Sequence, residues 1–210
     1  MTRKLVLSTN NVNKIQEIKY LLEDLPIQVL SKKDIGQGGF EILEDGESLE
    51  ANSQKKAMEL SELTNYMVVA DDSGLFVDAL GGKPGVFSSR YAGEEGNDRK
   101  NNEKLLEEMK NFQYEDRKAS FKAVVTLVTE DKQVINVHGQ CRGHIGFSLQ
   151  GPEVFGYDPL FIPEGYDKSF AELDMEIKNK ISHRAKALEK LKKVIKGLLE
   201  DDNYENPSNQ

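Results

Sequence analysis

The chain has 210 residues, of which 38% are hydrophobic and 30% are charged, a balance typical of a globular protein with one large domain or two lobes around a single sheet. No apolar run approaches the roughly 18 residues that a membrane helix needs, and the first residues are too polar for a signal peptide. We therefore expect a cytoplasmic protein with no membrane partner. The formal charge of -8 disfavours general binding to nucleic acid, which requires a basic face. The only cysteine, Cys141, cannot form an internal disulfide and has no neighbours at zinc-ligand spacing.

The first third of the chain alternates between strand and helix patterns. Short apolar runs bounded by polar residues predict strands, and apolar residues that recur every three or four positions predict helices. The expected elements are, in order, a strand at 5–7, a helix between Ile15 and Leu25, a strand at 27–31, a helix at 49–63 and a strand at 67–70.

The second half of the chain adds a hairpin and two helices. Residues 97–109 are expected to form a helix capped by Asn97, and another amphipathic helix begins near Ser182. Strand patterns at 119–129 and 134–142 are separated by a tight turn and predict a hairpin, so the sheet must be mixed. The fold class is therefore α/β, with a mixed β-sheet and flanking helices. We expect a single domain over residues 1–199, followed by a disordered acidic polar tail at 200–210.

The loop STNNVNK, residues 8–14, lies between the first strand and the first helix. A loop in this position presents unpaired backbone N–H groups and the positive end of a helix dipole, which together favour phosphate. Lys14 falls in the first helical turn, where a cation opposes the dipole unless an anion binds nearby. The alternative is an ordinary asparagine cap followed by a solvated lysine, and the residues alone favour neither.

Two acidic segments are candidates for a metal site. Asp71 and Asp72 follow the apolar run 67–70, at the point where a buried strand is expected to leave the sheet. Adjacent carboxylates are costly without a nearby cation, and Mg²⁺ takes one or two carboxylates together with substrate phosphates. The alternative is an Asx-type turn before Gly74. The segment 44–56, EDGESLEANSQKK, also combines acids with lysines, although an ordinary solvated helix shows the same pattern.

Two later segments suggest a flat ligand and an anion. Residues 155–158, FGYD, place aromatic rings on both sides of a glycine, which suits stacking on a base, although aromatic residues in a turn more often belong to the core. In residues 178–184, KNKISHR, a cap at Ser182 puts His183 and Arg184 in the first turn of a helix. Cations at the start of two separate helices suggest a shared anion, whereas the lysines that follow are explained equally well as a solvated face.

Taken together, these segments resemble the Ham1/inosine triphosphate pyrophosphatase family. The matching blocks follow one another over nearly the whole chain: STNNVNK, EDGESLEANSQKKA, ADDSGLFVDALGGKPGVFSSRYAG, FGYDPLF and KNKISHRAKAL. The resemblance implies an elongated fold of two lobes with a central cleft, assembled as a homodimer. It also implies Mg²⁺-dependent hydrolysis of noncanonical purine nucleoside triphosphates (ITP, dITP and XTP) to the monophosphate and pyrophosphate, which removes them from the nucleotide pool.

The resemblance further assigns roles to individual residues. Glu44 and Asp72 correspond to the acids of the Mg²⁺ site, and Asp72 is also the position of the general base, with Asp71 as its neighbour. The residues that correspond to substrate contacts are Thr9, Asn11, Lys14, Lys56, Ser73, Phe155, Gly156, Tyr157, Asp158, Lys178, His183 and Arg184.

Base selectivity follows from hydrogen-bond chemistry within this resemblance. Hypoxanthine and xanthine carry an acceptor at C6 where adenine carries a donor, so buried donors from Lys178, His183 or Arg184 would be left unpaired by adenine. Two rival interpretations remain. One is a related pyrophosphatase that acts on modified pyrimidine or standard nucleotides. The other is a nucleotide-sensing or protein-binding module, which the presence of all the acids and lysines disfavours.

Overall fold

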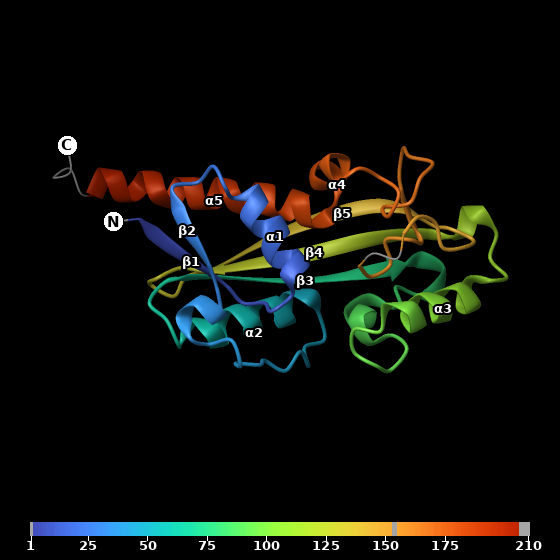
Figure 1. Ribbon diagram of the computed structural model, residues 1–210, viewed down its shortest axis with the longest axis horizontal. Helices are drawn as coiled ribbons and strands as arrows, with labels where there is room; N and C mark the ends of the chain where they lie inside the picture. The colour runs from blue at the N-terminus through green and yellow to red at the C-terminus, as the bar shows by residue number, and fades with distance from the viewer. Residues whose placement is uncertain (1, 153–154, 206–210) are drawn as a thin grey trace.

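A six-stranded mixed sheet runs through the computed structural model, which describes residues 2–152 and 155–205 (Figure 1). The strands are β1 (Arg3–Leu7), β2 (Ile27–Ser31), β3 (Met67–Val77), β4 (Lys118–Val128), β5 (Val134–Ile145) and β6 (Phe161–Pro163). Their order across the sheet is β2-β1-β3-β4-β5-β6. The pairs of β1 with β2 and β3 are parallel, and the remaining pairs are antiparallel. The expected α/β class with a mixed sheet is confirmed.

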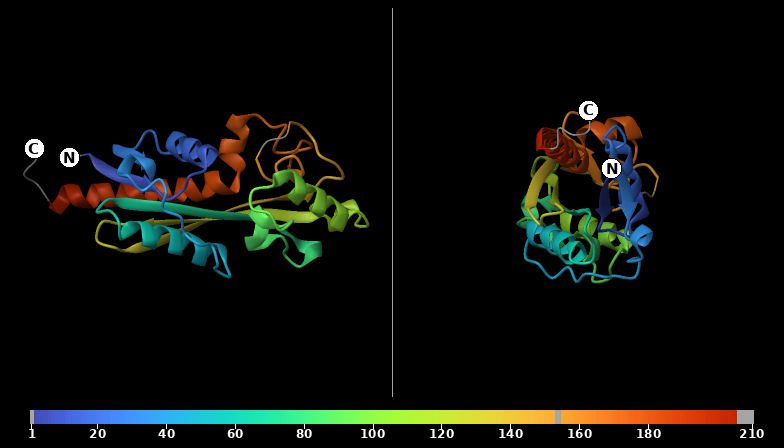
Figure 2. Two further views of the ribbon diagram at one scale, coloured as in Figure 1. Left: turned by 60° about the horizontal axis from the view of Figure 1, so that its bottom comes forward. Right: turned by 90° about the vertical axis from the view of Figure 1, so that its left-hand side faces the viewer.

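Helices cover both faces of this sheet (Figure 2). They are α1 (Val12–Leu21), α2 (Leu49–Ser61), α3 (Asp98–Met109), α4 (Met175–Ile181) and α5 (His183–Glu205). Four short 3₁₀ helices lie at Lys33–Ile35, Asp78–Leu80, Gly85–Arg90 and Tyr114–Asp116. Helices α1 and α5 lie on one face and α2 on the other, and the two chain ends lie at the same end of the molecule (Figure 1). Among the described residues, no helix is both long and apolar enough to cross a bilayer.

The core divides into clusters that follow the alternation of side chains along the strands. Leu5 and Leu7 of β1 pack with α1 and α5, whereas Val6 between them faces Ala57 and Leu60 of α2. A third cluster lies at the other end of β3, β4 and β5 and contains the aromatic residues Phe121, Tyr157, Phe161 and Phe170. Because these long strands extend through both groups of clusters, the molecule is elongated, with two lobes that share one sheet (Figure 1).

Local sequence signals fixed most of the element ends. The strand expected at 27–31 is confirmed. Asn97 and Ser182 cap α3 and α5 as predicted, because their side-chain oxygens accept hydrogen bonds from the backbone N–H groups of Lys100 and Ala185. The hairpin is also confirmed, with Lys132 in the turn at a φ of 66°. Cys141 is buried, which raises the pKa of its thiol to about 11.

The third strand differs from its prediction in a way that matters for the site. It does not leave the sheet at Asp71 but continues to Val77, because β4 pairs with it from Val68 onward. The expected strand end, and the alternative of an Asx-type turn before Gly74, are both wrong. Glycine is required at position 74 for a different reason, which is the close approach of another backbone segment. A Cβ at this position would lie 2.3 Å from the carbonyl oxygen of Gly85.

The C-terminal region also differs from the expectation. Helix α5 extends to Glu205, so most of the segment expected as a disordered tail is helical, and residues 206–210 lie outside the described residues. Helix α4 and strand β6 were not predicted. Helix α5 approaches β5 very closely at its start: a Cβ on Gly139 would lie 1.9 Å from the carbonyl oxygen of His183. This contact fixes the first turn of α5, and with it His183 and Arg184, against the sheet.

Candidate active site

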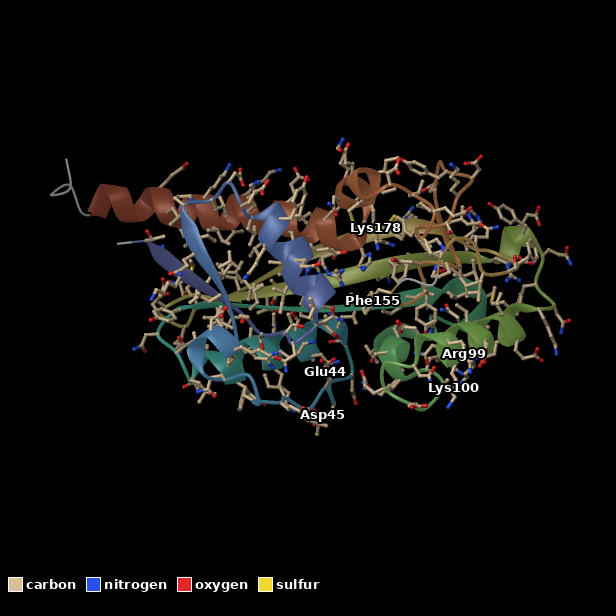
Figure 3. All side chains as sticks on the ribbon, viewed as in Figure 1. Glu44, Asp45, Arg99, Lys100, Phe155 and Lys178 are labelled. Atoms are coloured by element: carbon tan, nitrogen blue, oxygen red, sulfur yellow. The ribbon has the colours of Figure 1, made fainter. Side chains whose placement is uncertain are left out.

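A cavity of about 1150 Å³ lies between the two lobes and collects every candidate residue named from the sequence. The lining includes Thr9, Asn11, Lys14, Glu44, Lys56, Asp71, Asp72, Ser73, Phe155, Gly156, Tyr157, Asp158, Lys178, His183 and Arg184. The residues come from both faces of the sheet: Glu44 lies on the side of α2, and Lys178 on the side of α4 (Figure 3). Segments as far apart in sequence as the first loop and the last helix therefore meet in one site.

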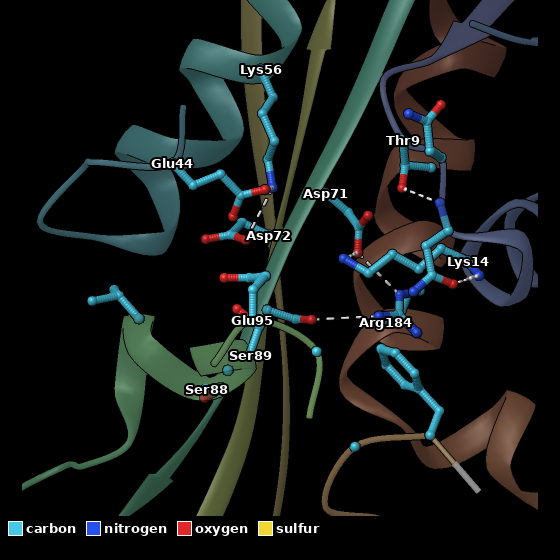
Figure 4. A pocket seen from close by; sticks show the side chains of 18 of the residues that line it. Thr9, Lys14, Glu44, Lys56, Asp71, Asp72, Ser88, Ser89, Glu95 and Arg184 are labelled. Carbon is cyan, nitrogen blue, oxygen red and sulfur yellow. Dashed lines mark hydrogen bonds and ion pairs between the residues drawn. The ribbon is translucent and has the colours of Figure 1, made fainter. Parts of the chain in front are cut away.

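The cavity opens along a free edge of β3. Strand β1 pairs with β3 only as far as Val69, where the N–H of Ser8 donates to the Val69 carbonyl. Among the described residues, no strand continues this pairing beside Asp71 and Asp72. Because neighbouring residues of a strand point to opposite faces, the two carboxylates stand on opposite sides of β3, and the cavity is bordered by both (Figure 4).

The first loop is organised as an asparagine cap. The side chain of Asn11 accepts from the N–H of Lys14 at 3.1 Å, and Thr9 Oγ1 accepts from the N–H of Asn11 at 3.1 Å. The cap is therefore confirmed, but the solvated lysine that accompanied it in the alternative interpretation is wrong. Lys14 is largely buried, its Nζ lies 3.2 Å from Asp71 Oδ2, and burial lowers the pKa of its ammonium.

Asp71 is the centre of a buried ion-pair cluster, named here the Asp71 cluster, that also contains Lys14, Arg184 and Glu17. Arg184 Nε donates to Asp71 Oδ2 at 3.1 Å, and Arg184 Nη1 pairs with Glu17. Although burial opposes ionisation, the charges of Lys14 and Arg184 outweigh it and hold the pKa of Asp71 well below 3.8. The anion shared by the cations at the two helix N-termini is therefore the carboxylate of Asp71. Asp71 Oδ1 remains buried without a hydrogen-bond partner.

Asp72 belongs to a second group, the Asp72 cluster, on the other side of β3 with Lys56, Glu44 and Asn52 (Figure 4). Lys56 Nζ lies 3.0 Å from Asp72 Oδ1 and 3.1 Å from Glu44 Oε1. Asn52 Nδ2 donates to Asp72 Oδ2 at 3.3 Å. Helix α2 supplies both Lys56 and Asn52 from its buried face, so the description of this segment as an ordinary solvated helix is wrong for Lys56.

The electrostatics of the Asp72 cluster are unbalanced. Burial raises the pKa of Asp72, and the like charge of Glu44 adds to this rise while Lys56 opposes it. Burial alone would lower the pKa of Lys56, but Asp72 and Glu44 reverse the effect and raise it. One ammonium therefore faces two carboxylates that repel each other.

This donor set fits a magnesium ion that binds together with a phosphorylated ligand. The described residues contain no group of three or more side chains able to hold a metal by themselves. Mg²⁺ commonly takes only one or two carboxylates and completes its coordination with phosphate oxygens and water. Glu44 and Asp72 supply that number, and a divalent cation would relieve their repulsion.

The turn at 155–158 splits into exposed and buried parts. Phe155 is 40% exposed and lines the cavity, whereas Tyr157 is only 4% exposed and its hydroxyl donates to the Ser88 carbonyl. Asp158 is buried and pairs with Lys178. The core interpretation of these aromatic residues therefore holds for Tyr157 but not for Phe155.

His183 lines the same end of the cavity and carries a buried polar atom without a partner. Its ring stacks on Phe121 with centroids 4.7 Å apart, and its Nδ1 is buried without a hydrogen-bond partner. Burial and the charges of Arg184 and Lys178 lower its pKa well below 6.5, so the imidazole is neutral. A buried polar atom without a partner is rare in folded proteins and is accounted for if a ligand completes it.

The cavity also contains residues that the sequence analysis did not single out. Glu17 lies three positions after Lys14 on α1, so the helical spacing was a signal that could have placed it on the same face as Lys14. Arg90 Nη2 donates to the backbone carbonyl of Glu44 at 2.9 Å, and Asp98 accepts from the N–H of Gly156 at 2.8 Å. Lys32, at the end of β2, also lines the cavity. Arg90 and Asp98 had no local signal, because their partners lie far away in sequence.

Comparison with known proteins decides the family. The profile of the Ham1 family matches residues 5–194. The chain belongs to the Ham1 family. Among curated Ham1 relatives, the dITP/XTP pyrophosphatase of Clostridium perfringens is 48% identical over 203 residues, covering 94% of this chain and 99% of the relative. The dITP/XTP pyrophosphatase of Clostridium tetani is 48% identical over 202 residues, covering 95% and 99%.

Solved Ham1 structures have the same fold. A HAM1 protein from Coxiella burnetii superposes with a TM-score of 0.85 at 37% identity, over 93% of this chain and 100% of that one. The Ham1 protein of Staphylococcus aureus gives a TM-score of 0.83 at 36% identity, over 93% of this chain and 99% of that one. The elongated two-lobed architecture expected from the resemblance is thereby confirmed.

Proposed function

We propose that this Ham1-family protein hydrolyses noncanonical purine nucleoside triphosphates, namely ITP, dITP and XTP, to the monophosphate and pyrophosphate. The observation that carries the proposal is the cavity along the free edge of β3, where the Asp72 cluster lies between cations on one side and an aromatic turn on the other. Curated relatives of nearly the same length carry the name dITP/XTP pyrophosphatase. Removal of such nucleotides from the nucleotide pool is the expected cellular result.

The phosphates are assigned to cations and helix ends. Thr9, Asn11 and the start of α1 offer backbone N–H groups and the positive end of the helix dipole. Lys14 and Lys56 add ammonium groups from opposite sides of β3. Phosphoryl transfer depends mainly on positioning and on the stabilisation of charge, so these groups supply most of what the reaction needs.

Glu44 and Asp72 are assigned to Mg²⁺, with Ser73 as a substrate contact beside it. The ion would neutralise charge on the phosphate oxygens as pyrophosphate leaves. Asp72 also accepts a proton from the attacking water. The water oxygen forms a bond to the α-phosphorus, and the bond from that phosphorus to the bridging oxygen breaks. The electron pair of that bond leaves with pyrophosphate.

The purine is assigned to the other lobe. Phe155 offers an exposed ring for stacking, and Gly156 to Asp158 form the rest of the turn. His183 Nδ1 is the free polar atom best placed to meet the base edge, with Lys178 beside Asp158. Arg184 plays a different part from the one expected, because its Nε and Nη1 are engaged by Asp71 and Glu17. It holds the pocket wall in place and has fewer donors left for the base.

A substrate panel tests this function. Purified protein with Mg²⁺ is given ITP, XTP, dITP, GTP, ATP and dUTP, and the release of pyrophosphate and orthophosphate is measured separately. We expect rapid release of pyrophosphate from the first three. Equal turnover of ATP or dUTP would favour a different pyrophosphatase, and release of orthophosphate would exclude the proposed bond cleavage.

We also propose a cytoplasmic location, as expected from the sequence, and a homodimer, as the family resemblance implies. Size-exclusion chromatography with light scattering tests the second of these. A mass of about 47 kDa, twice the 23.6 kDa of the chain, supports the dimer, and a monomeric mass contradicts it.

A further inference from the structure

Lys32 occupies an unusual place at the edge of the cavity. Strands β1 and β2 are parallel and in register with Leu7 beside Ser31, so Lys32 lies next to Ser8, the first residue of the expected phosphate loop. Both Lys32 and Ser8 are buried and both line the cavity. Ligands of open α/β sheets bind beyond the carboxyl ends of parallel strands, which is where these two residues lie.

The charge of Lys32 is less compensated than that of its neighbours. Its side chain is only 5% exposed, and its Nζ donates to the Phe40 carbonyl at 2.8 Å. Within the described part of the chain, no carboxylate lies within salt-bridge distance of this ammonium, although Glu41 attracts it from farther away. The cavity cations that do have carboxylate partners are Lys14, Lys56, Arg90, Lys178 and Arg184. Lys32 can therefore bind an anion without losing an ion pair.

The order of the strands indicates which anion Lys32 would bind. The residues assigned to the base lie towards β4 and β5, where His183 stacks on Phe121 and its carbonyl abuts Gly139. The reacting carboxylate Asp72 is on β3, and the phosphate loop follows β1. A triphosphate that extends from Asp72 on β3 past the loop after β1 would reach β2 with its last group, and Lys32 stands at the end of β2. The ammonium of Lys56 is close enough to lower the pKa of Lys32, so the two cations border one region.

We propose that Lys32 is a phosphate-binding residue for the terminal phosphate of the substrate and for the pyrophosphate that is released. This inference rests on the proposed function, because it concerns the far end of the same site. The competing role is structural: through the Phe40 carbonyl, Lys32 holds the segment that leads to Glu44. The test must therefore separate loss of an anion contact from loss of that support.

Lys32→Met removes the charge and keeps much of the side-chain volume, and Lys33→Met is the matched control because Lys33 is its exposed neighbour. Binding of inorganic pyrophosphate and of IMP, both with Mg²⁺, is measured by calorimetry for the wild type and both variants. Since Lys32→Met removes a charged hydrogen-bond donor, we expect it to weaken pyrophosphate binding at least about tenfold. IMP has no terminal phosphates, so its affinity should stay within about twofold of wild type by the same reasoning. Lys33→Met should change neither.

Two results would overturn the inference. One is an unchanged pyrophosphate affinity in Lys32→Met, and the other is an equal loss of pyrophosphate and IMP, which indicates the structural role. If Lys32→Met does not fold, the wild type decides the matter by NMR: the side-chain signal of Lys32, assigned with Lys32→Arg, must shift with pyrophosphate and not with IMP. A wild type that binds pyrophosphate through Lys32 but hydrolyses none of the purine triphosphates would contradict the proposed function and leave this inference standing.

Discussion

Asp71 and Asp72 are neighbours in sequence, yet the structure gives them opposite surroundings. In the Asp71 cluster, two carboxylates face two cations, Lys14 and Arg184, and the pKa of Asp71 falls. In the Asp72 cluster, two carboxylates face the single ammonium of Lys56, and the pKa of Asp72 rises. The charges of the first cluster balance, and the second carries one excess negative charge.

This difference suggests how one short segment serves two purposes. The balanced Asp71 cluster ties α1 and α5 to the sheet and has no excess negative charge to attract a metal ion. An unbalanced cluster at the cavity attracts a divalent cation and keeps a carboxylate ready to take a proton. We therefore assign Asp71 to positioning and Asp72 to the chemistry, and four experiments test the contrast.

The largest effect is expected for Asp72→Asn. Loss of the proton acceptor and of one metal ligand should lower kcat for ITP by about 10³-fold, within the range seen for general bases. Binding of ITP should survive, because Lys14, Lys56 and the base pocket remain. The control is Asp45→Asn, which removes an exposed carboxylate beside Glu44 that pairs with Lys55 at the surface. A fully active Asp72→Asn enzyme would refute the assignment.

Asp71→Asn should act on stability instead. Removal of one partner from a buried ion pair costs about 3–5 kcal/mol, so the free energy of unfolding in urea should fall by that amount at pH 7. The pKa of Asp71 is lowered in the fold, so its contribution is complete above pH 3.8 and disappears as the pH falls through the native pKa. The difference from wild type should accordingly persist at pH 4 and shrink in stronger acid.

The surface pair of Asp24 with Lys192 provides the control for this measurement. Asp24→Asn should leave the unfolding free energy close to that of the wild type, because exposed ion pairs contribute little. If Asp71→Asn is as stable as wild type but inactive, Asp71 takes part in the chemistry and the contrast between the clusters is lost.

Glu44→Gln removes the excess negative charge of the Asp72 cluster, and its effect should appear in the Mg²⁺ requirement. Chelation of divalent cations should abolish turnover by the wild type, and the variant should need at least about tenfold more Mg²⁺ for half-maximal activity. Glu47→Gln, an exposed acid in the same segment, should leave the Mg²⁺ requirement unchanged. An unaltered requirement in Glu44→Gln would remove Glu44 from the metal site.

The smallest effect concerns the two pKa values themselves. Titration of the carboxyl carbons by NMR without metal should place the pKa of Asp72 above 3.8 and that of Asp71 below it. In Glu44→Gln the pKa of Asp72 should move down, because a repelling charge is gone, while Asp71 should be unaffected. Coincident titration of both carboxyl groups in the wild type would show that their surroundings do not differ as described.

Much of the fold was predictable because its signals are local. Helix caps at Asn11, Asn97 and Ser182 depend on a side chain and the next turn of backbone, and all three are present. The end of β3 was not predictable in this way. An apolar run that ends on two acids, Asp71 and Asp72, is typical of a strand that leaves the sheet. However, β4, about 50 residues away, pairs with both residues and keeps them in the strand.

In the candidate site too, some features were predictable from the sequence and others were not. Residue types and their order were enough to name the acids, lysines and aromatic residues that the cavity brings together. The cations at two helix N-termini also indicated an anion, since such cations are unfavourable alone. That this anion is Asp71, that Arg184 is largely engaged by carboxylates and that Lys32 faces the cavity were not evident from the sequence.

The sequence by itself determined the local elements, the chemical groups and the family resemblance, because each depends on residues close together or on their identity. Only the tertiary structure decided which charged side chains lie close to one another in the Asp71 and Asp72 clusters. That outcome depends on the pairing of β3 with β1 on one side and β4 on the other, and on the docking of α1, α2 and α5 against opposite faces of the sheet. Interaction between charges depends on their distance and burial, and neither quantity is written in the spacing along the chain.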